Sequence, residues 1–328
     1  MDFSDSKHDL VGYALVGFGR FCRNRLIPAF SQISGSRIVA LYKRDLHEAL
    51  QAAREFGIPR GYNDYSELLR DPQIEAVYIT SANADHEWQA VRAAGSGKHV
   101  LCEKPLATSV AGCRNMIQAC RENGVKLMVA QTLRFSPAVR QVKEWLATGK
   151  LGRIKEAGAF FTYDGTKSPR SWLYDYQLAG GGVLMDIGVH CIDTLRYLLG
   201  EIIGTAGVVG PAHQQDPIER MASIFLRFES GAFGSVFCSY DFAYGSSLEI
   251  VGEHGKIVAK PFTIAQQPAE VRLELESDSQ TLVMNCENAY GELIESFSRA
   301  VRGQGDVAIT GEEGLRNIEI IEGIYSQR

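Results

Sequence analysis

The segment Gly97-Lys98-His99-Val100-Leu101-Cys102-Glu103-Lys104-Pro105-Leu106 is the stretch on which the prediction of the fold is built. Val100-Leu101-Cys102 is a short apolar run, as expected for a strand buried on both faces of a parallel sheet. The run ends at Glu103-Lys104-Pro105, where Pro105 cannot donate to a sheet and favours extended backbone at Lys104. Lys104 is therefore expected at the carboxyl end of a buried strand, where open α/β sheets bind ligands. From spacing alone, a surface lysine at a strand end fits equally well.

Buried strands and helices alternate around this segment. Apolar runs predict further strands at residues 13–16, 37–42, 76–80 and 126–130, with helices between them. Strands linked in series by helices pair in parallel, because each crossover helix packs on a face of the sheet. The pattern predicts a doubly wound parallel sheet, and residues 1–130 are assigned to a dinucleotide-binding domain.

A second stretch that can carry chemistry is Gly180-Gly181-Gly182-Val183-Leu184-Met185-Asp186-Ile187-Gly188-Val189-His190-Cys191-Ile192-Asp193. Asp186 and His190 are four residues apart, so they share one face of a helix. The three glycines are expected to leave the helix N-terminus clear of side chains, which lets a ligand approach closely. Histidine exchanges a proton near neutral pH, and a nearby carboxylate can orient the imidazole or bind a hydroxyl group. From spacing alone, an Asp/His pair on a helix surface is the simpler interpretation.

Together, GKHVLCEKPLA and GGGVLMDIGVHCIDTL resemble the glucose–fructose oxidoreductase and inositol dehydrogenase family, known as Gfo/Idh/MocA. The resemblance extends from about Tyr13 to the final TGEEGLRN segment. It implies catalytic roles for Lys104, Asp186 and His190. His190 would be the acid or base at the reacting oxygen, Lys104 would stabilise negative charge there or relay the proton, and Asp186 would position His190 and a substrate hydroxyl group. Which of Lys104 and His190 transfers the proton directly is left open.

A glycine turn follows the first strand, with the sequence Gly17-Phe18-Gly19-Arg20-Phe21-Cys22 ahead of an apolar-periodic helix. Strand, glycine turn and helix form the context of a dinucleotide-binding fingerprint. Gly17 permits the tight turn, and Gly19 lets backbone N–H groups approach a pyrophosphate at the helix N-terminus. Cys22 stands where Gly or Ala is usual, and it is small enough for close helix packing. A tight turn without a ligand is the alternative.

The residues after the second strand bear on the choice of cofactor. An acid there usually holds the ribose 2′-hydroxyl of NAD, whereas a basic residue accepts the 2′-phosphate of NADP. Lys43 and Arg44 occupy this position, while Asp45 and Glu48 form a capping-box-like start to the next helix. In related NADPH-using proteins an arginine stands where Arg44 does. NADP(H) is therefore predicted in preference to NAD(H), with a solvated Lys–Arg pair as the alternative.

The loop after the third predicted strand is Ser81-Ala82-Asn83-Ala84-Asp85-His86. The family usually has Thr-Pro-Asn followed by His here, so Asn83 and His86 match and Ala82 departs from the pattern. The resemblance implies a cofactor site that includes Thr80, Asn83 and His86, together with Glu103 and Lys104. A His86 packed on the sheet is the slightly favoured alternative.

The second half of the chain is rich in strand patterns. After a helix at residues 138–147, strands are predicted at residues 154–163, 223–228, 231–240, 248–251, 256–259 and 271–275. Many alternate apolar and polar residues, as antiparallel strands with one buried face do. Residues 131–328 are assigned to an α+β domain with a large open, mainly antiparallel sheet for substrate binding. Its uncovered face is a natural surface for a homodimer or homotetramer.

Three further residues are candidates for substrate binding. Arg134 lies in a segment resembling the family's interdomain connection, and it could contact substrate or brace the domains. Tyr163 and Trp172 lie in a stretch that is expected to form a wall of the substrate site. The family often has arginine directly after this tryptophan, where this chain has Leu173, so an anion contact is expected to be missing.

Composition excludes several function classes. The 328 residues suit two domains, and a formal charge of -5 without a Lys/Arg cluster argues against nucleic acid. Seven scattered cysteines without a CxxC pair fit reduced thiols in a cytoplasm, and no metal site is indicated. No apolar signal core or membrane-spanning run is recognised.

The predicted activity is that of a nicotinamide-dependent oxidoreductase acting on a sugar, inositol or related cyclic polyol. One alternative is a glycoside hydrolase of the same family that retains its nicotinamide and oxidises the sugar only transiently. Another is a dinucleotide sensor without catalysis, which has no use for Lys104, Asp186 and His190. The substrate and the direction of reaction are not predicted.

Overall fold

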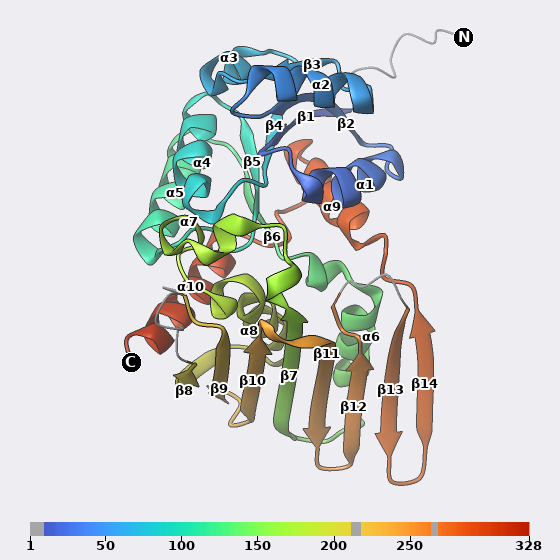
Figure 1. The fold of residues 1–328 in the computed structure, drawn as a ribbon. Helices are drawn as coiled ribbons and strands as arrows, with labels where there is room; N and C mark the ends of the chain where they lie inside the picture. Colours follow the sequence, from blue (N-terminus) through green and yellow to red (C-terminus); the bar gives the residue numbers. More distant parts are fainter. Residues whose placement is uncertain (1–9, 211–217, 264–267, 328) are drawn as a thin grey trace, which may run out of the picture. The chain divides into compact units, whose positions relative to one another are not determined.

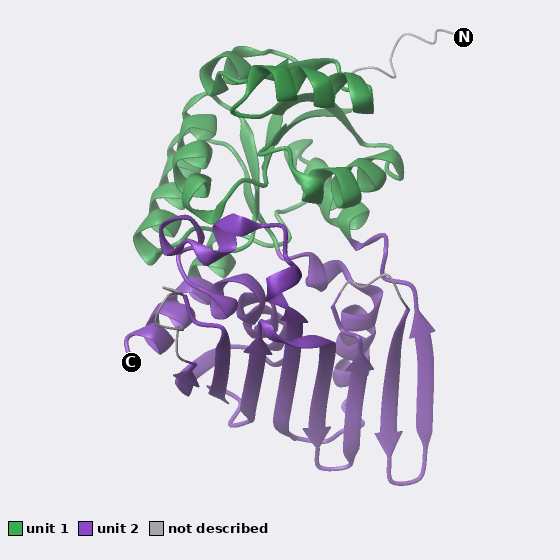
Figure 2. Ribbon diagram, viewed as in Figure 1, with its two compact units in different colours: residues 1–130, 290–315 green, residues 131–289, 316–328 purple. Residues whose placement is uncertain are grey.

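The computed structural model describes residues 10–210, 218–263 and 268–327, and the chain divides into two compact units (Figure 2). Unit 1 comprises residues 1–130 and 290–315, and unit 2 comprises residues 131–289 and 316–328. The sequence prediction assigned residues 290–315 to the second domain, whereas they pack in unit 1. Ser298 of helix α9 (Ala289–Val301) explains this, because its Oγ lies 2.8 Å from Tyr13 Oη and 2.6 Å from Ser36 Oγ.

Unit 1 is built on six parallel strands in the order β3-β2-β1-β4-β5-β6. In chain order these are Val11–Val16, Ser36–Tyr42, Arg60–Tyr62, Ala76–Ile79, His99–Glu103 and Leu127–Ala130. Figure 1 shows α4 and α5 on one side of the strands and α1 and α9 on the other. The predicted doubly wound parallel sheet is therefore confirmed, with the strand order typical of dinucleotide-binding folds.

Burial explains why the apolar runs predicted these strands. All residues of β1 and β4 are buried, as strands covered on both faces must be. The exception is β3, an edge strand of three half-buried residues that has no apolar run and was not recognised. The helices of unit 1 that lie wholly between these strands are α1 (Ile27–Ser31), α2 (Leu46–Phe56), α3 (Tyr65–Arg70), α4 (His86–Gly95) and α5 (Val110–Glu122).

Unit 2 contains an eight-stranded sheet in the order β14-β13-β12-β11-β7-β10-β9-β8. In chain order the strands are Ile154–Asp164, Ile202–Val209, Met221–Phe228, Phe233–Ser239, Asp241–Gly252, Gly255–Lys260, Ala269–Leu275 and Ser279–Met284. Every pair is antiparallel except β7 with β10, which confirms a mainly antiparallel sheet. Strands β8 and β14 were not recognised in the sequence.

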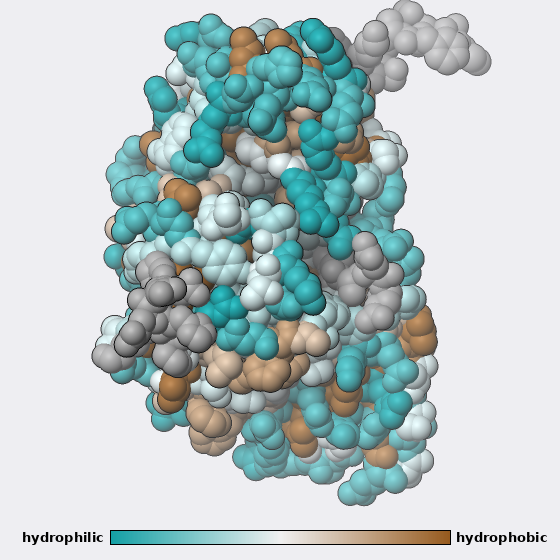
Figure 3. Space-filling model, in the orientation of Figure 1, coloured by the Kyte–Doolittle hydropathy of each residue, from teal (hydrophilic) through white to brown (hydrophobic). Residues whose placement is uncertain are grey.

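One face of this sheet is covered by helices, and the other carries exposed aromatic rings. Helix α6 (Pro137–Ala147) packs on β12 and β13, and α8 (Val189–Leu199) packs on β7. The exposed apolar side chains on the strands include Phe160, Phe225 and Phe233. Figure 3 shows apolar residues in brown among hydrophilic ones over these strands.

The segment Tyr176–Leu199 is long and apolar enough to span a membrane by length and composition alone. It includes α7 (Tyr176–Ala179) and α8, and 83% of its most apolar window is buried inside the protein. Asp186 and Asp193 are among its buried residues. It is therefore a core segment of unit 2. The last helix, α10 (Gly311–Tyr325), runs to near the end of the described chain.

Candidate active site

The turn after β1 has the backbone geometry that a pyrophosphate-binding turn needs. Gly17 has a φ of +85°, and a Cβ on Gly17 would lie 2.6 Å from the backbone of Ser81. Gly19 is exposed, and the helical residues begin at Arg20. Glycine is required at position 17, and the amides of Gly19 and Arg20 lie at an exposed helix N-terminus, which favours a phosphate.

The two aromatic residues of the turn support it from within unit 1. Phe18 is 2% exposed, and its ring centroid lies 5.5 Å from that of Phe56. The Phe21 ring lies 5.5 Å from the Tyr290 ring. A cofactor contact of Phe18 is consequently restricted to its backbone.

Side-chain contacts of Thr80 and Cys22 connect the glycine turn to the end of β4. Thr80 Oγ1 donates to the Val16 carbonyl at 2.9 Å and lies 3.1 Å from Cys22 Sγ. Cys22 is fully buried, and burial raises the pKa of its thiol to about 11. The small residue at this position packs closely, as expected. The Thr80 hydroxyl is used within the protein, which favours a supporting role over a cofactor contact.

The residues after β2 differ in their surroundings. Asp45 caps α2, because its Oδ1 accepts from the Glu48 backbone N–H at 2.8 Å, as predicted. The Glu48 side chain reaches Lys43, with 2.6 Å between Oε2 and Nζ. Arg44 is exposed, and no ion pair of Arg44 is found in the described part of the chain. Arg44 is therefore the cation best placed to receive a 2′-phosphate.

His86 is fully buried between two strand ends. Its Nδ1 lies 2.9 Å from the Pro105 carbonyl, and its Nε2 lies 3.3 Å from the Ser81 carbonyl. Burial lowers the pKa of His86, so the neutral ring has one N–H, and the shorter contact favours donation to Pro105. This placement agrees with the alternative of a His86 packed on the sheet. Asn83 is also buried, in the turn that precedes α4.

Lys104 directly follows β5, as the sequence predicts, and it is half-buried. The preceding residue is held in place: Glu103 Oε1 accepts from Tyr78 Oη at 2.8 Å, and Glu103 Oε2 accepts from the Lys104 backbone N–H at 3.3 Å. The segment carrying Lys104 is thereby fixed to the neighbouring strand β4.

The predicted residues of unit 1 follow the strands β1, β2, β4 and β5, which are neighbours in the sheet. Carboxyl ends of parallel strands meet at one edge, where such sheets bind ligands. Unit 1 therefore brings together the glycine turn, Lys43, Arg44, Asn83 and Lys104 at one edge.

In unit 2, Asp186 and His190 lie beside strand β7. Asp186 belongs to a π-helical turn (Leu184–Gly188), and His190 lies in the first turn of α8. Tyr163 Oη donates to Asp186 Oδ2 at 2.8 Å, and the ring centroids of Phe161 and His190 are 6.3 Å apart. Phe161 and Tyr163 share one face of β7, so Asp186 and His190 lie along the same strand.

Arg170 completes this cluster. Its Nη1 donates to Asp186 Oδ1 at 3.3 Å, and its Nη2 donates to Asp186 Oδ2 at 3.2 Å and to Tyr163 Oη at 3.1 Å. Burial, and then the charge of Asp186, raise the pKa of Tyr163. Leu173, which stands where the family often has arginine, is buried, and Arg170 brings a guanidinium group to Asp186 from three residues earlier. Trp172 is half-buried in the short 3₁₀ helix Ser171–Tyr174.

The glycines before this helix do not leave its N-terminus open, which corrects the expectation. The Glu219 carboxylate accepts from the backbone N–H of Gly182 at 2.9 Å and of Leu184 at 3.1 Å. A Cβ on Gly182 would overlap the Glu219 backbone. Tyr325 Oη donates to Glu219 at 2.6 Å. Gly182 therefore allows the Glu219 backbone to approach closely, and the Glu219 carboxylate accepts the N–H groups that a ligand was expected to meet.

Arg134 is held inside unit 2. Its Nε and Nη2 donate to the two carboxylate oxygens of Asp193 at 2.9 and 2.7 Å. Asp193 is buried and also accepts from Asn317 Nδ2 at 2.8 Å. This two-point ion pair favours a bracing role for Arg134 over a substrate contact.

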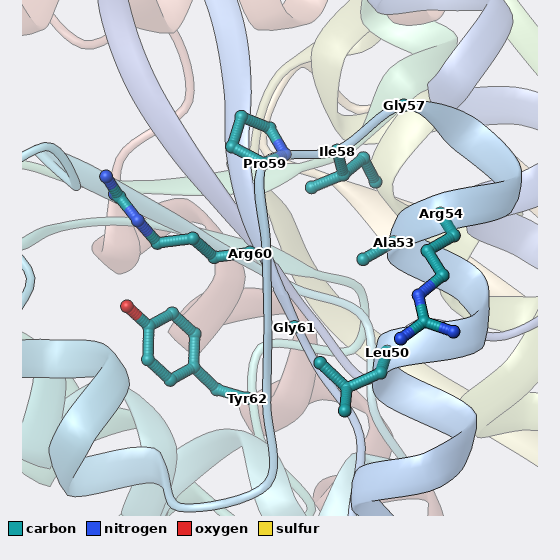
Figure 4. A pocket seen from close by; sticks show the side chains of 9 residues that line it. All are labelled: Leu50, Ala53, Arg54, Gly57, Ile58, Pro59, Arg60, Gly61 and Tyr62. Atoms are coloured by element: carbon teal, nitrogen blue, oxygen red, sulfur yellow. The ribbon is translucent and has the colours of Figure 1, made fainter.

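A surface hollow of unit 1 lies apart from these residues. It is lined by α2, by β3 and by the residues between them, including Arg54, Arg60 and Tyr62 (Figure 4). Arg60 is paired with Asp71 at 2.6 Å, so it serves the edge strand. None of the predicted site residues lines this hollow.

All seven cysteines are buried and free. Within residues 10–210, 218–263 and 268–327, no group of three or more His, Cys, Asp or Glu side chains could hold a metal ion.

Comparisons with known proteins match both halves of the chain. A family profile described as "Oxidoreductase family, NAD-binding Rossmann fold" matches residues 11–131, and one described as "GFO/IDH/MocA C-terminal domain" matches residues 139–258. The trans-1,2-dihydrobenzene-1,2-diol dehydrogenase of Mus musculus is 34% identical over 223 residues, 68% of this chain and 66% of the relative. The 1,5-anhydro-D-fructose reductase of Ensifer adhaerens is 29% identical over 308 residues, 92% of each chain.

A solved structure extends the likeness to the whole fold. The crystal structure of aldose-aldose oxidoreductase from Caulobacter crescentus, complexed with glycerol, has a TM-score of 0.90 at 27% identity. The match covers 97% of this chain and 97% of that chain.

Proposed function

Because the chain belongs to the Gfo/Idh/MocA family of NAD(P)-dependent oxidoreductases, we propose that it transfers a hydride between NADP(H) and a carbinol or carbonyl carbon of a sugar, inositol or related cyclic polyol. The observation that carries this proposal is Lys104 after β5, at the sheet edge that also holds the glycine turn with Gly17 at a φ of +85°. A positive side chain beside a dinucleotide-binding turn suits a reaction that develops negative charge on oxygen.

The residues of unit 1 fit a nicotinamide dinucleotide. Gly17 and Gly19 provide the turn for the pyrophosphate, and Arg44 provides a cation for a 2′-phosphate. When bound, the nicotinamide supplies or accepts the hydride, which is chemistry that belongs to the cofactor. Arg44 is the basis for preferring NADP(H) to NAD(H).

Proton transfer falls to residues of this chain. His190 acts as acid or base at the reacting oxygen, since an imidazole exchanges protons near neutral pH. Lys104 stabilises negative charge on that oxygen or relays the proton. Asp186, Tyr163 and Trp172 belong to the substrate side, and Asp186 is fixed by its hydrogen bonds to Tyr163 and Arg170.

The names of the relatives support the substrate class. A reductase of 1,5-anhydro-D-fructose, a dehydrogenase of a cyclic diol and an aldose oxidoreductase bound to glycerol all involve polyhydroxy compounds or a diol.

The seven free, buried cysteines support a cytoplasmic location, because reduced thiols persist there. The uncovered sheet face of unit 2 supports assembly with a second copy of the chain.

The test is a screen of sugars and polyols with NADP+ or NADPH, followed by the absorbance of the reduced nicotinamide. We expect substrate-dependent change of this absorbance with at least one polyol. Release of sugar from a glycoside at constant absorbance would indicate a nicotinamide-retaining hydrolase instead. Cofactor binding without turnover of any polyol, glycosides included, would indicate a sensor.

A further inference from the structure

We propose that Arg170, held by Asp186 and Tyr163, binds a hydroxyl or carbonyl oxygen of the substrate and favours uncharged polyhydroxy compounds over carboxylated or phosphorylated ones. This inference rests on the proposed function, and it names the substrate class of the same site. It assigns Asp186 a positioning role that acts through Arg170.

The exposure of the cluster indicates which side chain meets a ligand. The Asp186 side chain is 4% exposed, whereas that of Arg170 is 42% exposed. Both carboxylate oxygens of Asp186 accept hydrogen bonds, Oδ1 from Arg170 and Oδ2 from Arg170 and Tyr163. Arg170 is therefore the member of this ion pair that a substrate can reach.

Arg170 also retains donors for a ligand. A guanidinium group has five N–H donors in a rigid planar fork. The hydrogen bonds of Arg170 to Asp186 and Tyr163 engage one N–H of Nη1 and both of Nη2. Within the described residues this leaves the Nε–H and one Nη1–H to be donated to an incoming oxygen. Because Asp186 fixes the fork, these donors are held in a defined direction.

The charges of the cluster select the kind of oxygen. Asp186 lies 3.2 Å from the guanidinium and offsets its positive charge. A neutral hydroxyl or carbonyl oxygen can accept from Arg170 without disturbing this ion pair. A carboxylate or phosphate would compete with Asp186 for the guanidinium and would be repelled by the Asp186 charge.

The position of the cluster indicates that Arg170 binds a substrate oxygen other than the one at His190. Phe161 and Tyr163 share one face of β7. The Phe161 ring lies near the His190 ring, and Tyr163 donates a hydrogen bond to Asp186. The cluster of Arg170, Asp186 and Tyr163 therefore lies beside His190 along β7, at a separate position. If His190 serves the reacting oxygen, Arg170 serves a second oxygen of the same substrate. The substrate class is therefore an uncharged compound with two or more such oxygens, a polyol or the matching hydroxy ketone.

The first test compares Arg170→Met with Arg153→Met, using a polyol that the wild type turns over. Arg153 is a matched control, because it precedes β7 at the opposite end and pairs with Glu253 at 3.4 Å. We expect Arg170→Met to raise KM by roughly 10- to 100-fold, the scale for losing a hydrogen bond from a charged donor. The value of kcat and NADPH affinity should stay within about threefold of wild type, and Arg153→Met should change nothing.

Two further variants separate recognition from folding. Arg170→Lys keeps a charge for Asp186 but lacks the fork, so it should retain most of the KM increase, whereas a structural ion pair would be rescued. Asp186→Asn removes the compensating charge. It should improve binding of the matching sugar acid, measured as a competitive inhibitor, relative to the neutral substrate by roughly 10-fold.

The outcomes are distinguishable. A wild-type KM in Arg170→Met or Arg170→Lys would overturn the inference. The ion pair of Arg170 with Asp186 would then only hold the loop in place. An unchanged or reduced preference for the acid in Asp186→Asn would overturn the charge argument. Failure of the wild type to turn over any polyol would instead overturn the proposed function, before any variant is compared.

Discussion

Lys43 and Arg44 both follow β2, but only one has an ion-pair partner among the described residues. Lys43 lies 2.6 Å from Glu48, whereas Arg44 is exposed. A bound 2′-phosphate should therefore depend mainly on Arg44. We expect Arg44→Ala to weaken NADPH binding by about 1.5–3 kcal/mol, the range for charge-assisted hydrogen bonds, and Lys43→Ala to have a smaller effect.

Fluorescence titration of both variants with NADPH and NADH measures this difference. NADH binding serves as the control, because it lacks the 2′-phosphate and should barely change. Tighter binding of NADH than of NADPH by the wild type would refute the cofactor preference.

His86 predicts a pH dependence of stability. Burial lowers the pKa of His86 in the folded protein, while an unfolded histidine titrates near about 6.5. As the pH falls below that value, the unfolded chain binds a proton that the folded chain does not. The stabilisation by neutral His86 is therefore present above about pH 6.5 and is lost as the pH falls toward the folded-state pKa.

The variant His86→Asn should remove this part of the pH dependence, since an amide N–H can replace Nδ1–H toward Pro105 without titrating. Urea unfolding at about pH 8 and about pH 5.5 measures the effect. We expect the wild type to lose more stability between the two pH values than the variant. The other histidines are present in both proteins, so their contributions to the pH dependence of stability cancel in this comparison. Equal losses would show that His86 does not titrate on unfolding.

Local residue patterns could be predicted from the sequence, and tertiary partners could not. Asp45 was identified as a cap because its partner is three residues away. The pairing of Asp186 with Tyr163 and Arg170 spans 23 and 16 residues and depends on how β7 and the following loop pack. The same holds for Glu219, which lies 37 residues from Gly182.

The helix that carries Asp186 and His190 depends on Glu219 for its start. Glu219 is buried, and it accepts from two backbone N–H groups and from Tyr325. Glu219→Gln replaces one acceptor oxygen with an N–H₂ group that faces these donors. We expect a loss of about 1.5–3 kcal/mol in the free energy of unfolding. Glu229→Gln, in an exposed turn, is the control in the same denaturation experiment. An equally large loss of unfolding free energy in Glu229→Gln would mean that the Glu219 cap has no special role.

Strands were predictable where apolar residues alternate or run together, and they were missed where they do not. The segment β3 has only Arg60-Gly61-Tyr62, and β14 is largely exposed. The parallel pairing of β7 with β10 is a property of topology, since both strands read as ordinary alternating segments. Helix α9 packs in unit 1, where Ser298 contacts Tyr13 of β1, and its amphipathic pattern alone does not identify that partner.

For the whole molecule, the uncovered face of the unit 2 sheet predicts assembly. Phe225 and Phe233 are 64% and 63% exposed, and Phe160 stacks on Phe237 with ring centroids 5.5 Å apart. Such an apolar face is typical of an interface between copies of a chain. We expect a dimer or tetramer in solution, and we expect the double change Phe225→Asp, Phe233→Asp to yield a monomer.

Light scattering at micromolar concentration tests this prediction. Leu46→Asp is the control, because Leu46 is an exposed apolar residue of α2 in unit 1. A monomeric wild type, or a double variant that remains assembled, would contradict the assignment of this face.

The central claim is that Lys104 and His190 both take part in the proposed oxidoreductase reaction. The most direct measurement is turnover and NADPH affinity of Lys104→Met and His190→Ala with one polyol that the wild type accepts. We expect turnover to fall by roughly 10²- to 10³-fold in Lys104→Met and by roughly 10²- to 10⁴-fold in His190→Ala, the usual scales for losing an electrostatic stabiliser and an acid or base. NADPH affinity should remain near that of the wild type in both. Near-wild-type turnover in Lys104→Met would mean that the segment after β5 is only structural, and it would contradict the proposed mechanism.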